Sequence, residues 1–171
     1  MTKDIDITLG VDTKDLDKVV KSIAAIGLEI IPDHFESFVE RTFVLPARHQ
    51  ESGIRVDFIF SFIPYERQAI DRAKSVLLAG EPVMFASAED VIIHKCFAGR
   101  PRDLEDAHSI VIKNPDLDQA YVRRWLKELE ILPERAGLSR AFEELLARIQ
   151  SECPSACPPR RRSSGSQSPA A

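Results

Sequence analysis

Three aspartates stand where strands are predicted, and together they suit a divalent cation. Asp4 and Asp6 are two apart in segment 4–9, whose alternation of polar and apolar residues is typical of a strand, so both face the same way. Asp57 lies in the apolar run 54–60, where an unpaired carboxylate is costly. If a neighbouring strand brings Asp57 beside the other two, Mg²⁺ or Mn²⁺ would relieve their repulsion. Two such ions can activate an attacking oxygen and stabilise leaving pyrophosphate.

The Asp-x-Asp spacing by itself is weak, because the same pattern recurs at 15–17 and 116–118, where helices are predicted to begin. There the two side chains fall on different faces and are explained as helix-start acids or solvated charges. The first pair differs because it lies on a predicted strand. Ile5 and Ile7 of that strand are expected to point the other way, into a core. A purely structural role for the three carboxylates remains the alternative.

A second group of charges lies in a predicted helical region. The helical neighbours of Lys95 are apolar or lack a side chain, so its amine is expected either to snorkel or to reach a cavity or a partner charge. Downstream, Asp103 and Asp106 share a helix face, and Arg100 and Arg102 lie nearby. One interpretation is an ion-pair network linking two helices. The other is that Lys95 and an arginine meet the phosphates of a nucleotide.

The periodicities predict an α+β protein, with a mixed sheet followed by a helical C-terminal part. Strands are expected at 4–9, 28–31, 38–45 and 54–60, with a hairpin at 75–79 and 83–86. Helices are expected from a cap at Thr13 to a stop at Gly27, and from about Tyr65 to Ala73.

From residue 87 the pattern becomes helical. Ser87 and Asp90 form a predicted capping box, and Gly99 with Pro101 separates the first helix from a second that runs to about 112. Two further helices have apolar faces made by Leu117, Tyr121, Trp125 and Leu129, and by Leu138, Phe142, Leu145 and Ile149. We therefore expect an α/β part at 1–86, a helical part of the same domain at 87–150 and a disordered Ser/Pro/Arg tail at 151–171.

Charge and cysteine content bound the class of protein. The part before residue 153 carries 20 basic and 27 acidic residues, a net of −7, and the tail adds the three basic residues at 160–162. An acidic body is unlike a duplex-binding surface but suits cation binding.

Three cysteines give no disulfide framework, and Cys153 and Cys157 lack a second pair for zinc. No signal peptide or membrane-spanning run is recognised, so a cytoplasmic protein without membrane partners is expected.

Three segments together resemble small bacterial nucleotidyltransferase-like proteins, a group that includes the abortive-infection toxins of toxin–antitoxin pairs. Residues 2–7, Thr-Lys-Asp-Ile-Asp-Ile, resemble the second half of the nucleotidyltransferase signature. Residues 56–59, Val-Asp-Phe-Ile, resemble the strand of its third carboxylate. Residues 89–106 resemble its lysine and arginine-aspartate helices and are the most specific part. The similarity spans residues 2 to about 130.

The resemblance implies Mg²⁺-dependent (or Mn²⁺-dependent) transfer of a nucleoside monophosphate from an NTP to RNA, a protein or a small molecule. Asp4 and Asp6 would hold the metal, with Asp57 as third carboxylate and base. Lys95 would contact the nucleotide, with Arg100 and Arg102 beside it, and Asp106 would support that side of the cleft. The implied catalytic and metal-binding residues are thus Asp4, Asp6 and Asp57, and the implied nucleotide-binding residues are Lys95, Arg100, Arg102 and Asp106.

The family also places a helix with Gly-Gly or Gly-Ser before the first carboxylate strand, and its backbone holds the triphosphate. Here Met1 stands three residues before Asp4, so an N-terminally truncated or degenerate copy is expected, and its activity is in question. Two alternatives follow: a non-catalytic interaction module, such as a partner subunit or the counterpart of an antitoxin, or a metal-dependent phosphohydrolase using the same acids.

Overall fold

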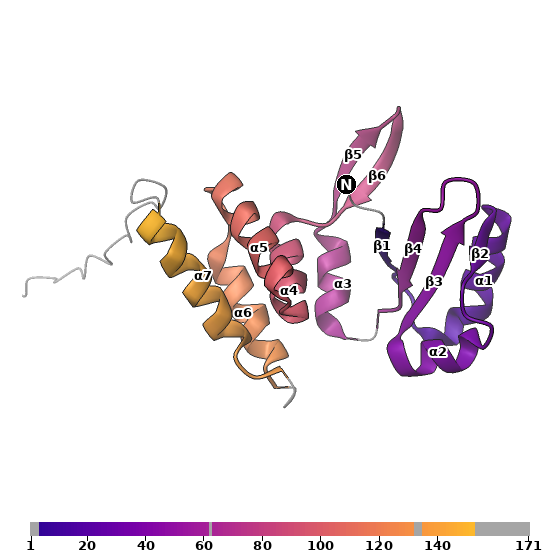
Figure 1. Cartoon of the computed structure of the whole chain (residues 1–171), viewed down its shortest axis with the longest axis horizontal. Helices are drawn as coiled ribbons and strands as arrows, with labels where there is room; N and C mark the ends of the chain where they lie inside the picture. The colour runs from indigo at the N-terminus through magenta and orange to yellow at the C-terminus, as the bar shows by residue number, and fades with distance from the viewer. Residues whose placement is uncertain (1–3, 62, 132–134, 153–171) are drawn as a thin grey trace, which may run out of the picture. The chain divides into compact units, whose positions relative to one another are not determined.

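The computed structural model describes residues 4–61, 63–131 and 135–152 and is drawn in Figure 1. The fold is mixed α+β: within those ranges it has seven α-helices, a four-stranded mixed sheet and a two-stranded sheet. The chain divides into two compact units, residues 1–86 and 87–171, with both sheets in the first. Across the described ranges, no helix is both long and apolar enough to cross a membrane.

The larger sheet has the strand order β1-β4-β3-β2. Its strands are β1 (Asp4–Thr8), β2 (Leu28–Ile30), β3 (Val44–His49) and β4 (Arg55–Ile59). β1 runs parallel to β4, and the other two pairings are antiparallel. Gly53, at φ +68°, lies in the turn that joins β3 to β4, where a left-handed backbone conformation favours glycine.

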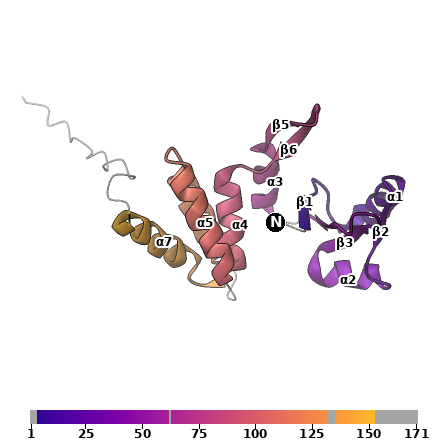
Figure 2. The ribbon, with the colours of Figure 1, turned by 45° about the horizontal axis from the view of Figure 1, so that its top comes forward.

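One face of this sheet carries the core of the first unit. Four buried sheet residues make that face: Leu45, Ala47, Val56 and Phe58. α1 (Leu16–Ala25) adds Ile23 and α2 (Phe35–Thr42) adds Val39, both with essentially no exposed surface. In Figures 1 and 2 α1 lies along β2 and α2 lies against the end of β3. Burial of each large apolar side chain in this core, such as Ile23 or Leu45, stabilises the fold by roughly 1.5–3 kcal/mol.

The strand predicted at 38–45 is wrong over residues 38–43 and overlaps the observed strand only at its last two residues. Residues 35–42 form α2, and the strand begins only at Val44. The segment is rich in aromatic and β-branched residues, which favours a strand, but Phe35, Phe38 and Val39 also have helical spacing. The segment adopts the helical conformation because the helix places Val39 in the core. Phe43, in the left-handed conformation at φ +56°, ends the helix. The predicted cap at Thr13 also shifts by one residue, since the Asp12 side chain accepts the Lys14 N–H.

The expectation that Ile5 and Ile7 point into a core is wrong as well. They pair with Val56 and Phe58, so they lie on the core face, but they remain 48% and 39% exposed. The reason is position: β1 is an edge strand, and the helices that cover the core face lie over β2 and β3.

The first unit continues into α3 (Pro64–Asp71) and a hairpin of β5 (Lys74–Leu78) and β6 (Glu81–Phe85). The predicted short helix and hairpin are thus confirmed. Tyr65 and Ala69 of α3 are buried, whereas every residue of β5 is exposed.

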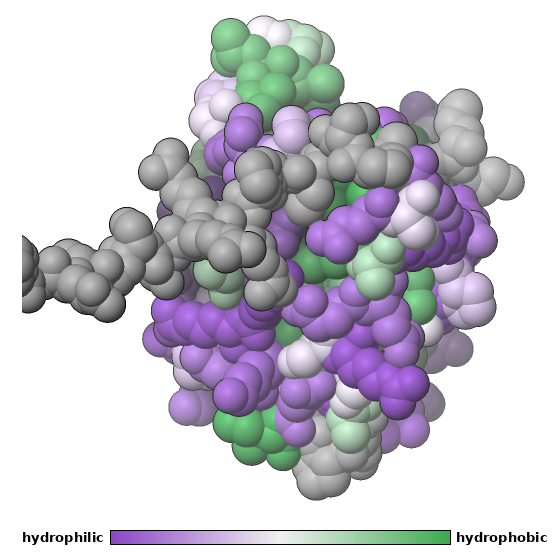
Figure 3. All heavy atoms as spheres, turned by 90° about the vertical axis from the view of Figure 1, so that its left-hand side faces the viewer, coloured by the Kyte–Doolittle hydropathy of each residue, from purple (hydrophilic) through white to green (hydrophobic). Residues whose placement is uncertain are grey.

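The described part of the second unit contains four helices, α4 (Ala88–Ala98), α5 (Pro101–Lys113), α6 (Gln119–Leu129) and α7 (Leu138–Glu152). The two predicted apolar faces are confirmed, because all eight residues are buried, seven on α6 and α7 and Leu117 just before α6. α7 reaches Glu152, so the predicted tail cannot start at 151; residues 153–171 lie outside the described part. Figure 3 looks onto the side of the molecule where α7 lies, and hydrophilic side chains cover most of it.

Candidate functional site

Parallel pairing of β1 with β4 brings two of the predicted carboxylates side by side. Asp6 stands opposite Asp57 in the register, and Asp4 stands opposite Arg55. Residues opposite each other on neighbouring strands share a face, so all four belong to the face away from the core. Asp4 and Asp6 are exposed and Asp57 is half-buried. The first unit therefore presents three carboxylates on one patch of sheet, as expected from the strand pattern.

Arg55 is the residue that sequence reasoning missed. Its Nε lies 2.8 Å from Oδ1 of Asp57, whose side chain is only 19% exposed. The hydrogen bond to Asp57 raises the pKa of Arg55, and the charges of Asp4 and Asp6 add to that effect. The guanidinium thus lies in the electrostatic field of all three carboxylates. Its single positive charge offsets part of the repulsion between them. The signal was present, because Arg55 is two residues before Asp57 and must share its face.

The donor set is chemically suited to magnesium, which prefers carboxylate oxygens. As arranged, however, the described residues include no group of three His, Cys, Asp or Glu side chains that could together hold an ion. In this arrangement the Arg55–Asp57 ion pair also occupies one oxygen of the third carboxylate. A cation bound by Asp6 and Asp57 would have to compete with the guanidinium.

The second predicted group lies within the helical unit, where α4 and α5 meet. The Lys95 amine is 2.8 Å from Oδ2 of Asp106 and 3.1 Å from Oδ1 of Asp103. Hydrogen bonding to Asp106, followed by that to Asp103, raises the pKa of Lys95 against the cost of its partial burial. Lys95 therefore neither snorkels freely nor lacks a partner. It takes part in an ion-pair network between two helices.

Asp103 is the centre of that network. Its side chain is 5% exposed, and it also accepts the Nε–H of Arg100 at 2.5 Å. Arg100 and then Lys95 lower the pKa of Asp103 below its usual range, despite burial. Arg102, in the first turn of α5, is exposed. Of the four residues with a predicted nucleotide role, Lys95 and Asp106 are thus in direct contact, and Arg100 joins them through Asp103.

A third polar cluster is predictable from the sequence only in part. Ser87 caps α4 by accepting the Asp90 N–H, which is one of the two hydrogen bonds of the predicted capping box. The fully buried Asp90 carboxylate accepts hydrogen bonds from Ser87 Oγ at 2.6 Å and from the Tyr121 hydroxyl at 2.8 Å. The Tyr121 contact spans 31 residues, so no local pattern could have found it. It ties the start of α4 to α6.

Two potential nucleophiles have structural surroundings instead. Cys96 is buried on α4, and burial raises the pKa of its thiol to about 11, so it stays protonated at neutral pH. Ser61 is buried and donates its hydroxyl to the Leu9 carbonyl oxygen. Cys153 and Cys157 lie outside the described residues.

Comparison with models of protein families gives no match to this chain, and comparison with curated protein sequences gives no match either.

Proposed function

We propose that this chain is a nucleotidyltransferase-like protein whose chemistry is metal-dependent transfer of a nucleoside monophosphate from an NTP to an acceptor. The observation that carries the proposal is the register that puts Asp6 beside Asp57, with Asp4 on the same face. Carboxylates on adjacent strands are the arrangement from which a magnesium site for phosphoryl chemistry is built. The resemblance of residues 2–7, 56–59 and 89–106 to nucleotidyltransferase-like proteins supports the same class.

The roles follow from position and charge. Asp4 and Asp6, which are exposed, would hold the cation, and it would neutralise triphosphate charge when bound. Asp57 would complete the donor set and accept the proton of the attacking hydroxyl. Arg55 would leave Asp57 when the cation arrives and could then pair with a phosphate oxygen, because a guanidinium suits either anion.

The helical unit has a proposed role in nucleotide contact. Lys95 and Arg100 are the cations that would meet phosphate, with the exposed Arg102 beside them, while Asp106 would orient Lys95 through its 2.8 Å contact. Asp103 is added to this set because it holds Lys95 and Arg100 together. The acceptor is an RNA, a protein or a small molecule.

A non-catalytic role is a second candidate, and the Arg55–Asp57 ion pair favours it. In this role Arg55 replaces a cation at Asp57, the only half-buried member of the three carboxylates, while the exposed Asp4 and Asp6 stay in contact with solvent. In that case the chain would act as a partner subunit or as one member of a toxin–antitoxin pair.

Product analysis distinguishes these possibilities. The chain is incubated with each α-labelled NTP, Mg²⁺ or Mn²⁺, and total RNA or a protein extract. Transfer gives pyrophosphate and a labelled acceptor, a phosphohydrolase releases inorganic phosphate, and a binding module gives neither. Asp6→Asn and Asp57→Asn should each lower transfer by more than about a hundredfold. Asp17→Asn is the matched control, because Asp17 belongs to another Asp-x-Asp pair, on α1, and is exposed.

A further inference from the structure

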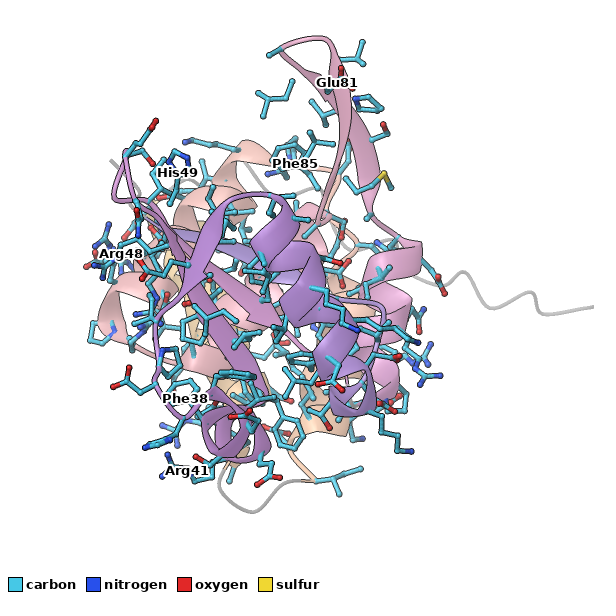
Figure 4. The ribbon with its side chains drawn as sticks, turned by 90° about the vertical axis from the view of Figure 1, so that its right-hand side faces the viewer. Phe38, Arg41, Arg48, His49, Glu81 and Phe85 are labelled. Carbon is cyan, nitrogen blue, oxygen red and sulfur yellow. The ribbon has the colours of Figure 1, made fainter. Side chains whose placement is uncertain are left out.

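The hairpin of β5 and β6 exposes apolar side chains on both of its faces. Five of its large apolar residues are 46–74% exposed: Val76, Leu77, Leu78, Met84 and Phe85. In Figure 4 Glu81 and Phe85 mark the two ends of β6, and the side chains between them stand out from the ribbon. Apolar groups also gather at the top of Figure 3, where the hairpin lies. A two-stranded sheet of this kind is marginal alone and needs a third strand or a cover.

The two edges of the hairpin differ in their ability to accept a strand. Leu77 stands opposite Pro82 and Ser75 opposite Met84. Since proline has no N–H, the Leu77–Pro82 pair must be of the type whose backbone groups point outward, and antiparallel pairs alternate, so Ser75–Met84 is of that type too. The turn agrees: Ala79 and Gly80 have φ of 52° and 92°, the pattern of a two-residue type I′ turn flanked by a hydrogen-bonded pair.

It follows that β5 directs two N–H and two C=O groups outward, from Ser75 and Leu77. The outer edge of β6 directs the C=O groups of Pro82 and Met84 outward but only one N–H, that of Met84, because Pro82 has none. Proline on an outer edge is a common way to prevent strand addition. Within the described residues no further strand borders either edge of this sheet. The hairpin therefore has one open edge and one blocked edge.

We propose that β5 pairs with β5 of a second copy of this chain, antiparallel about a two-fold axis at Val76. In that register Ser75 of one copy and Leu77 of the other exchange both backbone hydrogen bonds, and the symmetry repeats the exchange, giving four bonds. The result is a four-stranded sheet in the order β6-β5-β5-β6.

In this register the side chains of one β5 strand are compatible with those of the other β5 strand. Val76 and Val83 are cross-strand partners within one hairpin, so the two copies align a continuous row of four valines on one face. β-Branched residues facing each other stabilise a sheet. Lys74 stands opposite Leu78 of the other copy, so no like charges face each other. Because Pro82 blocks the remaining edge, addition stops at two copies and gives a closed dimer in place of a fibre.

Sedimentation equilibrium on the full chain tests the proposal, with a dimer expected at twice 19.2 kDa. Ser75→Pro removes an outward N–H from the open edge and two of the four bonds, and should weaken the dimer by about tenfold or more. Met84→Pro is the matched control, because it removes the opposite outward N–H from the blocked edge and should leave the dimer intact. A monomeric parent chain, or equal behaviour of the two proline variants, overturns the proposal.

A charge exchange tests the register without relying on proline. Val76→Lys places two lysines directly opposite each other and should give a monomer, and Val76→Glu should do the same with two glutamates. Mixing the two variants should restore a heterodimer, since the introduced lysine of one copy then faces the introduced glutamate of the other. Val76 is 48% exposed, so both variants should fold. If the mixture stays monomeric while the parent chain dimerises, the two copies do not meet at Val76.

Discussion

Arg55 and Asp57 lie two residues apart on β4, and their side chains are in contact at 2.8 Å. The contact places one positive charge among the three carboxylates of this sheet face. Three aspartates without a cation would repel one another and destabilise the sheet. The guanidinium offsets that repulsion in the metal-free protein. A cation bound at this face, as proposed, would compete with Arg55 for the same oxygen, and its affinity would be lower than the carboxylate count alone suggests.

This competition gives a first prediction. Arg55→Gln should bind Mn²⁺ about tenfold more tightly than the parent chain, because the cation no longer displaces a guanidinium. The measurement is the melting temperature over a Mn²⁺ titration, since a ligand that binds the native state raises it by mass action. Arg41→Gln, an exposed arginine on α2, is the control. Asp57→Asn should abolish the Mn²⁺ effect; a full Mn²⁺ response in that variant would exclude Asp57 as a ligand.

Lys95 gives a second prediction at this scale. If Lys95 contacts the nucleotide, Lys95→Met should weaken NTP binding by about tenfold or more, whereas the exposed Lys127→Met should not. Calorimetric titration with each NTP measures the affinity. Both roles of Lys95 predict a lower melting temperature, because Asp103 loses a partner. Unchanged affinity with lowered stability would leave Lys95 a purely structural ion-pair residue.

Asp103 makes a third prediction, on pH. Arg100 and Lys95 lower the pKa of Asp103 in the folded chain, so folding favours its ionised form. The stability that this supplies is present above the unfolded pKa of about 3.9 and is lost as the pH falls through the lower folded value. Asp103→Asn should therefore cost about 2 kcal/mol at pH 7 and much less near pH 2. Urea unfolding at both values measures this; a cost independent of pH would show that the charge of Asp103 does not matter.

At the scale of elements, α4 and α6 are joined by a buried polar contact in addition to apolar packing. Asp90 is fully buried, and Ser87 and Tyr121 donate hydroxyl hydrogens to its carboxylate. A buried carboxylate is tolerated only when donors surround it. The contact therefore fixes how α6 docks on the start of α4.

A fourth prediction follows for this contact. Tyr121→Phe should lower the free energy of unfolding by about 1–3 kcal/mol, because it removes a donor and leaves the buried carboxylate less satisfied. Asp90→Asn should cost a comparable amount. In the double variant the cost should be less than the sum of the two single costs, since both changes remove one interaction. Strict additivity in chemical denaturation would show that the two side chains are not coupled.

At the scale of the whole molecule, the chain has two compact units with different secondary structure and separate sets of titratable groups. The predicted catalytic carboxylates belong to the first unit, and the predicted nucleotide-contacting residues belong to the second. Each group is held by its own unit: a strand register in one, and an inter-helix ion-pair network in the other.

A fifth prediction concerns the C-terminal end. Residues 153–171 contain four prolines and hardly any apolar side chain, so they cannot bury enough surface to offset ordering entropy. Ending the chain after Glu152 should leave the melting temperature unchanged. Ending it after Arg148 should lower it, because Ile149 is buried and Glu152 pairs with both Arg148 and His108. A fall of several degrees in the first variant would show that the tail packs on the body.

The sequence by itself determined what local pattern controls. Alternation identified β1 and therefore put Asp4 and Asp6 on one face, an apolar run identified β4, and helical spacing identified the buried faces of α6 and α7. Stop signals such as Gly27 and Gly99 placed helix ends, because both adopt positive φ. These features depend on residues within a few positions of each other, so the chain carries them without reference to the fold.

Tertiary structure decided what depends on distant partners. Residues 38–42 combine strand-favouring residue types with the helical spacing of Phe35, Phe38 and Val39, and the packing of Val39 into the core selected the helix. Ile5 and Ile7 look like core residues, but an edge position leaves them exposed. The pairing of Asp6 with Asp57 and the hydrogen bond from Tyr121 to Asp90 join residues 51 and 31 positions apart. No local pattern encodes such pairings, because they exist only once strands are registered and helices are docked.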